Sequence, residues 1–291
     1  MKLARYSANG KTSIGLVQDD RIYDIPSVLP ALPQDITGIL AAGASALAAI
    51  REALPGTQVG VPLAQVRLEA PIPRPSKYLA IGMNYNDHAE ECRQAGIPIP
   101  KAQVWFNKQV SCITGPFDDI HRPFVSDKMD YEAELGVVIG KRCRHVSVDK
   151  ALDMVGGYFV ANDVTARDWQ HATPTWTLGK SFDTHGPIGP WIVTADEVAD
   201  PQNLNMRLYV NGQLRQQQTT GDMIYKIAEQ IAHLSTVMTL EPGDLIASGT
   251  CAGIGIALKP PCFLQAGDVV RVEIDGIGHL ENKVIDEPRV A

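Results

Sequence analysis

The sequence predicts a strand-dominated α+β fold. Short segments that are apolar, or that alternate apolar and polar residues, recur along the chain and are separated by turn residues. Several of them are close enough together to form hairpins, with Asn211-Gly212 as the strongest turn signal. The regular alternation of strand and helix that builds a doubly wound sheet is missing. With 291 residues, 45% of them hydrophobic and 20% charged, the chain is typical of a soluble globular protein with one large domain or two unequal ones.

The first seventy residues are predicted to form a unit of their own. Residues 2–6, 13–17 and 21–25 are short strand segments, which a turn at residues 18–20 helps to arrange as a small meander. Asp35 caps an alanine-rich helix that we expect to extend to about Leu54. Prolines at positions 71, 73 and 75 indicate a linker, since proline restricts its own φ and favours an extended residue before it. We therefore expect a small N-terminal α/β domain over residues 1–70 and a catalytic domain over residues 71–291.

The second unit is predicted to be mostly strands with a few helices. Strands are expected over residues 78–82, 131–140, 157–163 and 204–210. Residues 84–87 form a turn and helix cap, and the short helix that follows is ended by Gly96. Apolar residues from Ile224 to Leu234 recur at helical spacing and predict an amphipathic helix. The last hairpin pairs residues 269–274 with 277–284 across Asp275-Gly276.

Charge and composition exclude several classes of protein. The net charge of −7, without a dense block of Lys and Arg, argues against a nucleic-acid partner. The five cysteines form no Cys-x-x-Cys pair, which suits reduced thiols in a cytoplasmic protein better than a secreted disulfide framework. No apolar segment of signal-peptide type follows the basic N-terminus. The longest uncharged segment, residues 36–50, is shorter than the ~20 residues that a membrane span needs, so no membrane partner is expected.

Two glutamates in one predicted strand are the most informative polar residues. Glu132 and Glu134 lie two residues apart, so their side chains point to the same face of the strand. One interpretation is an exposed edge with two solvated carboxylates. The other is a metal site, where oxygen ligands favour Mg²⁺, Mn²⁺ or Ca²⁺ over Zn²⁺. Asp163, at the end of another apolar strand, could be a third ligand or simply a turn or helix-capping residue.

A histidine and a lysine offer acid–base and electrostatic chemistry. His88 and Glu91 are three residues apart in a predicted helix and share one face, so the carboxylate could orient the imidazole as a general base, or both could be surface residues. Lys180 lies in a turn-rich loop, where it could stabilise an enolate or remain a solvated ammonium. The glycine-rich residues 248–255 lack the Gly-Lys-Ser/Thr ending of a phosphate-binding loop, although close approach to a small anion is compatible with them.

Taken together, these segments resemble the fumarylacetoacetate hydrolase family. The similar segments are IGMNYNDH at residues 81–88, DYEAELG at 130–136, NDVTARD at 162–168, GKSFD at 179–183 and SGT at 248–250. They follow one another in the family's order and span residues 78 to about 284. The resemblance implies a mixed β-roll catalytic domain and a homodimer.

The resemblance also implies a set of site residues. An Mg²⁺ or Mn²⁺ ion, for which Ca²⁺ could substitute, would be held by Glu132, Glu134 and Asp163. Water would be activated by His88 with Glu91, and Lys180 would complete the catalytic group. The residues implied to line the site or contact the substrate are Gln170, Arg167, Thr250 and Gly249.

One departure from the family pattern indicates which branch of the family the chain resembles. The larger eukaryotic members have an additional carboxylate ligand seven residues before the histidine, where this chain has Ile81. The chain is therefore similar to the smaller three-carboxylate branch, which includes acylpyruvate hydrolases, oxaloacetate decarboxylases and hydrolases of diketo-deoxy sugar acids. The segments WTLGK at residues 176–180 and GPIGPW at 186–191 most resemble the sugar-acid members.

The resulting hypothesis is a metal-dependent hydrolase that cleaves a C–C bond of a small anionic 2,4-dioxo acid and releases pyruvate or a related 2-oxo acid. Two alternatives remain. The same metal site could decarboxylate oxaloacetate or isomerise a related oxo acid, neither of which needs an attacking water. The protein could also be a non-catalytic protein with a structural cation site, an interpretation that leaves His88, Glu91 and Lys180 unexplained.

Overall fold

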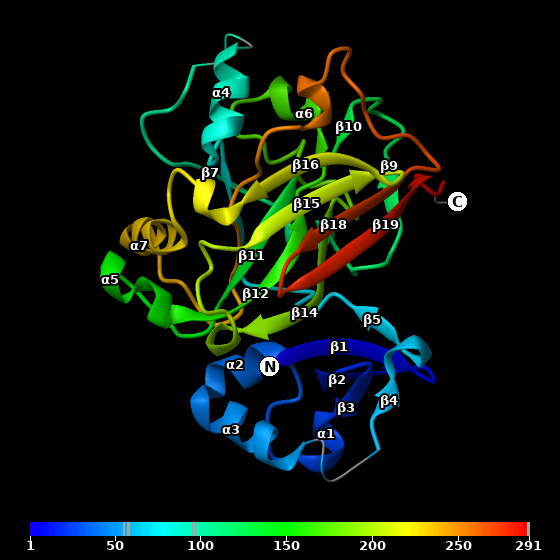
Figure 1. The fold of residues 1–291 in the computed structure, drawn as a ribbon, viewed down its shortest axis with the longest axis vertical. Coiled ribbons are helices and arrows are strands. Elements are labelled where there is room, and N and C mark those ends of the chain that lie inside the picture. Colours follow the sequence, from blue (N-terminus) through cyan, green and yellow to red (C-terminus); the bar gives the residue numbers. More distant parts are fainter. Residues whose placement is uncertain (55, 57–58, 95, 97, 290–291) are drawn as a thin grey trace.

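The computed structural model describes the chain except residues 55, 57–58, 95, 97 and 290–291. It is a strand-rich α+β fold built on one large mixed sheet and a smaller sheet packed against it (Figure 1). The strands of the large sheet are β1 (Lys2–Ala8), β2 (Lys11–Gln18), β3 (Arg21–Asp24), β4 (Val61–Pro62), β5 (Arg67–Glu69), β6 (Tyr78–Gly82), β7 (Val104–Asn107), β8 (Ile113–Thr114), β11 (Ala133–Ile139), β12 (Val155–Asn162), β14 (Gly186–Thr194) and β17 (Leu245–Ala247). Their order is β4-β3-β2-β1-β14-β12-β11-β17-β6-β7, with β5 beside β1 and β8 beside β14.

The smaller sheet runs in the order β16-β15-β18-β19-β9, and a two-stranded ladder joins β10 to β13. These strands are β9 (Ile120–Arg122), β10 (Met129–Asp130), β13 (Thr165–Ala166), β15 (Asn205–Val210), β16 (Gln213–Thr219), β18 (Val269–Ile274) and β19 (Gly278–Asp286). The two predicted hairpins at Asn211-Gly212 and Asp275-Gly276 are confirmed as β15–β16 and β18–β19.

The main hydrophobic core lies between the two sheets. It combines residues of β11 and β12, such as Leu135 and Val160, with residues of β15, β18 and β19, such as Leu208, Val272 and Leu280. The opposite face of β11 and β12 packs against the first unit of the chain in a second apolar cluster that includes Val138 and Phe159. Because β11 is covered on both faces and lies between β12 and β17, every one of its residues is buried.

The helices are short and lie at the margins of the sheets. They are α1 (Ile25–Val28), α2 (Ile36–Ala42), α3 (Ala44–Ala53), α4 (Asn86–Gln94), α5 (Val148–Ala151), α6 (Arg167–Ala172) and α7 (Ile227–Val237). In the described part of the chain, no single helix has the length and apolar composition of a membrane span. Only α2 and α3 taken together reach that composition, and they are bent by 112° at their break.

Two predicted helices differ from the observed ones. The single helix expected from Asp35 to Leu54 is broken at Gly43, whose φ of +72° is a conformation that glycine adopts without a steric penalty. The helix expected from Ile224 begins at Ile227 instead. The backbone N–H of Ile224 and Tyr225 donates to Asn84, so these residues are used to hold the loop after β6 rather than to start a helix.

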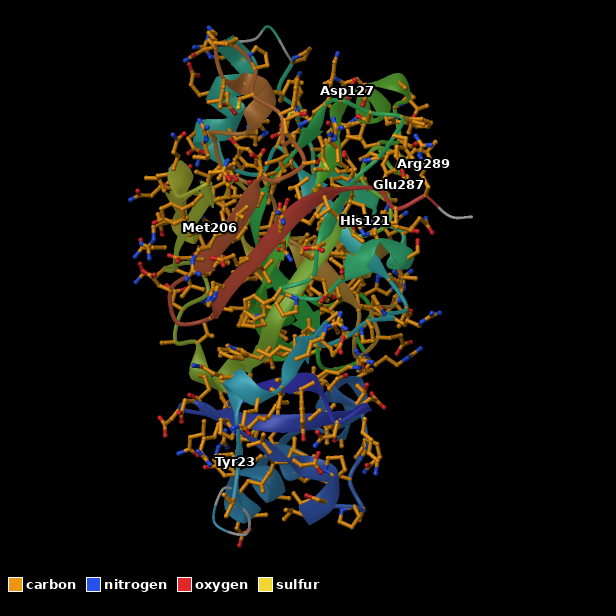
Figure 2. All side chains as sticks on the ribbon, turned by 90° about the vertical axis from the view of Figure 1, so that its right-hand side faces the viewer. Tyr23, His121, Asp127, Met206, Glu287 and Arg289 are labelled. Carbon is orange, nitrogen blue, oxygen red and sulfur yellow. The ribbon has the colours of Figure 1, made fainter. Side chains whose placement is uncertain are left out.

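The first unit continues the large sheet. β1 pairs with β14 in the register Lys2 with Val193 and Leu3 with Ile192, and the N-terminal ammonium donates to the hydroxyl of Thr194. Figures 1 and 2 both place this unit at one end of the molecule, and Figure 2 labels Tyr23 in it and Met206 in the smaller sheet. The division into domains at residues 70 and 71 stays a prediction.

Candidate active site

Three buried carboxylates converge where neighbouring strands end. Glu134 is the second residue of β11, Glu132 comes just before that strand, and Asp163 directly follows β12. Pairing of Ala133 with Asn162 brings these strand ends together, and the N–H of Asp163 donates to the carbonyl oxygen of Glu132 over 2.9 Å. One oxygen from each of the three carboxylates lies within 4.8 Å of the others. The exposed-edge interpretation of the glutamate pair is wrong, because Glu132 and Glu134 are 6% and 1% exposed.

Three cationic side chains balance part of this negative charge. Nζ of Lys180 donates to Oε2 of Glu132 over 2.7 Å and to Oδ2 of Asp163 over 2.6 Å. Nζ of Lys108 donates to Oδ1 of Asp163 over 2.6 Å, and Nη1 of Arg167 lies 2.7 Å from Oε1 of Glu132. All three cations are buried, so the ion pairs are little screened by solvent.

The surrounding charges shift the pKa values of the two glutamates in opposite directions. Burial alone would raise the pKa of Glu132, but the nearby Lys180 and Arg167 lower that pKa to about 2. The pKa of Glu134 is raised well above its usual value by burial and by the neighbouring carboxylates of Asp163 and Glu132. Oε2 of Glu134 accepts a hydrogen bond from the N–H of Gly249 over 2.7 Å. The repulsion between carboxylates that lie this close together is reduced when they share a cation.

The carboxylate cluster fits a hard divalent cation. Its three side chains offer oxygen ligands from two adjacent strand ends, which is the donor type that Mg²⁺, Mn²⁺ and Ca²⁺ prefer. The pKa of Glu134 is raised by burial and by the other two carboxylates of the cluster, so positive charge is lacking on that side. Glu132, Glu134 and Asp163 are therefore the residues that would hold the ion.

A histidine–carboxylate pair lies on α4. Nδ1 of His88 is 2.9 Å from Oε2 of Glu91, and Sγ of Cys92 is 3.9 Å from the other ring nitrogen. Burial disfavours the charged imidazole, but the hydrogen bonds with Cys92 and Glu91 outweigh burial and raise the pKa of His88 to about 9. The helix is attached to the loop after β17, since the N–H groups of Ala252 and Gly253 donate to Asp87 and Glu91.

The catalytic candidates line one cavity of about 500 Å³. The predicted site residues on its wall are His88, Glu91, Glu132, Arg167, Gln170, Lys180 and Thr250. Gly249 contributes through its backbone N–H to Glu134; its φ of +99° and its closeness to Asn84 leave no room for a side chain. The remainder of the wall is largely apolar and includes Ile81, Met83, Phe106, Trp176, Ile254 and Ile256.

The substrate-contacting candidates come mainly from α6 and the loop after β17. Nε of Arg167 donates to Asp130 over 2.8 Å and Nη1 donates to Oε1 of Gln170 over 3.0 Å, so α6 is fixed against β10. The hydroxyl of Thr250 accepts a hydrogen bond from Gln216 over 2.9 Å. The structure thus brings Arg167, Gln170 and Thr250 to the wall of one cavity.

Three buried residues of this site were missed by the sequence analysis. Lys108 follows β7 and has no local pattern that distinguishes it from a surface lysine, yet its ammonium is fully buried and also donates to the carbonyl oxygens of Lys180 and His185. Cys92 follows His88 by four residues, a helical spacing that could have indicated a shared face. Asp130 is also buried and accepts hydrogen bonds from the N–H groups of Gly255 and Ile256.

Comparisons with known proteins agree with this architecture. Residues 77–285 match the family described as fumarylacetoacetate (FAA) hydrolase, C-terminal. The mitochondrial oxaloacetate tautomerase fahd2 of Xenopus laevis is 43% identical over 291 residues, covering 98% of this chain and 90% of that protein. The fumarylacetoacetate hydrolase of Exiguobacterium antarcticum is 38% identical, with a TM-score of 0.85 and coverage of 99% and 100%. The maleylpyruvate hydrolase of Sphingobium sp. SYK-6, crystallised with manganese(II) and pyruvate, is 36% identical, with a TM-score of 0.83 and the same coverage.

Proposed function

The chain belongs to the fumarylacetoacetate hydrolase family, and from this premise we propose that it is a metal-dependent hydrolase that cleaves a C–C bond of a 2,4-dioxo acid. The observation that carries the proposal is the His88–Glu91 pair, with 2.9 Å between Nδ1 and Oε2, on the wall of the cavity that Glu132 and Lys180 also line. Such a pair is an arrangement that activates water. The relative crystallised with manganese(II) and pyruvate supports both the ion and the product class.

A divalent ion held by Glu132, Glu134 and Asp163 would act as a Lewis acid on the 2-oxo acid end of the substrate. Neutral His88, oriented by Glu91, takes a proton from a water molecule, whose oxygen attacks the 4-oxo carbon. The bond between carbons 3 and 4 then breaks, and its electron pair stays with the pyruvate fragment as an enolate. Carbon 3 finally takes a proton, which completes pyruvate.

Charged and polar groups of the chain complete the binding of the substrate. The ammonium of Lys180 is a buried cation that can face the enolate oxygen, and a fixed donor of this kind is worth roughly 3–4 kcal/mol in comparable sites. Arg167, Gln170 and Thr250 line the same cavity and offer hydrogen bonds to the substrate carboxylate.

A second candidate reaction is supported by a specific observation. The relative from Xenopus laevis, 43% identical over almost the whole chain, is an oxaloacetate tautomerase. Enol–keto exchange of oxaloacetate needs a proton donor and acceptor beside the same oxygen ligands, but it needs no water as a nucleophile. His88, held by Glu91 on the wall of the cavity, can transfer that proton.

A substrate panel with matched variants separates the candidates. Acylpyruvates, diketo-deoxy sugar acids and oxaloacetate should be assayed with Mg²⁺ and with EDTA, in the parent enzyme and in His88→Gln. We expect pyruvate to be released from an acylpyruvate or a diketo-deoxy sugar acid, EDTA to abolish the release, and His88→Gln to slow it about 100-fold or more. Faster enol–keto exchange of oxaloacetate without cleavage of any dioxo acid would instead establish the tautomerase. Cleavage by His88→Gln at the parent rate would reject the role of His88 in water activation.

A further inference from the structure

A thiol lies beside the general-base candidate on the wall of the cavity. Cys92 is one helical turn after His88 on α4, with its Sγ 3.9 Å from Nε2, while Nδ1 of the same ring is held by Glu91. Thiol, imidazole and carboxylate therefore follow one another in the order of nucleophile, base and orienting group. The distance is longer than a short hydrogen bond, as is common for such pairs before a ligand binds.

The other cysteines have different surroundings. Burial raises the pKa of Cys112 to about 11, and burial also raises the pKa of Cys143 and of Cys251. Cys262 is exposed. Cys92 combines a place on the wall of the described 500 Å³ cavity with an imidazole within reach of its sulfur. These are the surroundings in which a thiol becomes a nucleophile rather than an inert core residue.

An independent observation indicates what kind of molecule the cavity receives. Arg167 is 3% exposed and lines the cavity, and its Nη2 has no hydrogen-bond partner among the described residues. Its Nε and Nη1 are engaged by Asp130, Glu132 and Gln170, which fixes the guanidinium and leaves Nη2 as a donor. A buried guanidinium N–H without a partner is a place for a ligand carboxylate.

The rest of the wall favours an apolar body on the same ligand. Ile81, Met83, Phe106 and Trp176 line the cavity, together with Ile254 and Ile256. Phe106 and Trp176 pack edge to face, with ring centroids 5.6 Å apart. A ligand that contains a carboxylate, an apolar group and an electrophilic carbon between them would meet Arg167, these rings and the thiol in one cavity.

We propose that Cys92 is a covalent modification site for α,β-unsaturated oxo acids. When His88 is neutral, the thiol proton passes to its Nε2, and sulfur forms a bond to the alkene carbon that is β to the ketone. The π electron pair moves onto the oxo group as an enolate, and the proton returns from His88 to the α carbon. One thiol and one alkene thus give one thioether, with no oxidant, reductant or leaving group. The adduct occupies the cavity next to His88 and stops turnover.

This inference goes beyond the proposed hydrolysis, and its test does not measure hydrolysis. The probe is trans-3-benzoylacrylic acid, whose alkene lies between a phenyl ketone and a carboxylate. The protein carries Cys262→Ser so that the exposed thiol does not react. Intact-mass spectrometry and peptide mapping follow the adduct, and each rate is divided by the rate with glutathione. The methyl ester of the probe is the matched control that lacks the carboxylate charge.

We expect one adduct per chain, on the peptide that contains Cys92, with a rate that saturates as the probe concentration rises. The acid should react about tenfold faster than its ester after normalisation, because only the acid carries a charge for Arg167. Equal normalised rates for acid and ester, or an adduct on Cys112, Cys143 or Cys251 in the folded protein, would overturn the proposal.

Two variants test the roles of sulfur and base. Cys92→Ala should take up no probe, and His88→Gln should react about 100-fold more slowly while keeping its thiol. Thermal unfolding of both variants shows whether the cavity is still folded. A folded His88→Gln that reacts at the parent rate would reject assistance by the imidazole, and a folded Cys92→Ala that still forms an adduct would reject the site.

Discussion

At the scale of single residues, the site is governed by how its charges compensate one another. Glu132 is held as an anion by Lys180 and Arg167, whereas the pKa of Glu134 is raised by burial and by its carboxylate neighbours. Two glutamates that are two positions apart thus have opposite electrostatic roles. Replacement of each by glutamine, which keeps the shape and removes the charge, separates these roles.

We expect Glu134→Gln to change the stability of the metal-free protein by about 1 kcal/mol or less, because burial and the neighbouring carboxylates already disfavour a charge at this position and an amide oxygen can still accept from Gly249. Glu132→Gln, the matched control, should lower the free energy of unfolding by about 3–5 kcal/mol, since it removes a negatively charged partner of Lys180 and Arg167. Urea unfolding in EDTA measures both changes. The opposite ranking would contradict the assigned charges.

The same pair of variants tests the ion. In the parent protein, Mg²⁺ or Mn²⁺ at about 100 times its Kd should stabilise the fold by about 2.7 kcal/mol through mass action. Glu134→Gln should lose most of this stabilisation while remaining folded. A thermal shift on metal addition that persists undiminished in Glu134→Gln would place the ion elsewhere.

The pH dependence of turnover should depend on the His88–Glu91 contact. His88 must be neutral to accept a proton, and its pKa is raised to about 9, so kcat/KM should increase as the pH rises from neutrality through about 9. Glu91→Gln removes one of the interactions that raise this pKa. In this variant we expect the rise of kcat/KM with pH to occur at lower pH, and the maximal rate to be reduced about 100-fold. Initial rates at saturating Mg²⁺ measure both quantities. A rise of kcat/KM at unchanged pH would show that Glu91 does not raise the pKa of His88.

At the scale of elements, the β11–β12 pair sets the geometry of the ligands. Its register places Glu134 opposite Ala161 and Ala133 opposite Asn162, so that Asp163 follows directly beside the two glutamates. A slip of one residue would turn Glu134 away from the site. Gly136 faces Phe159 in this register, and a Cβ built on the glycine would lie 2.2 Å from the ring.

We therefore expect Gly136→Ala to destabilise the protein by about 1–3 kcal/mol, because the added methyl group overlaps the Phe159 ring in a tightly packed layer. The double variant Gly136→Ala/Phe159→Leu creates space at the same point and should recover part of the loss. Urea unfolding of the two single variants and of the double variant completes the cycle. Strict additivity would show that the ring is not what the methyl group meets.

At the scale of the whole molecule, the first unit and the rest of the chain share one sheet and one core. Leu3, Ile14 and Leu16 pack in the same cluster as Ile188 and Ile192 of β14. The site lies at the other end of the roll, near α4 and α6 (Figure 1). The contribution of the first unit is thus to cover the sheet that carries the site.

Residues 71–291 expressed alone should be less stable than the full chain, because removal of β1 exposes the edge of β14 and the apolar residues beneath it. We expect a lower midpoint of thermal unfolding and a greater tendency to aggregate, measured by calorimetry and light scattering. Equal unfolding midpoints for the fragment and the full chain would show that residues 71–291 are an independent domain.

Much of the site could be predicted because its signals are local. The spacing of two between Glu132 and Glu134 and of three between His88 and Glu91 depends only on strand and helix geometry. The hairpins at Asn211-Gly212 and Asp275-Gly276 were predictable for the same reason. The break at Gly43 was not, since a glycine within a helical pattern is compatible with either outcome.

The sequence alone therefore determined which side chains of this protein can supply metal ligands, a base and a cation, because those abilities are chemical properties of the residues and their near neighbours. Only the tertiary structure decided their environment. Lys108 meets Asp163 across 55 positions and Gly249 meets Glu134 across 115, contacts that depend on how strands far apart in the chain pair and bury their ends. Charge balance, and with it the raised pKa values of Glu134 and His88, arises from that packing rather than from any local pattern.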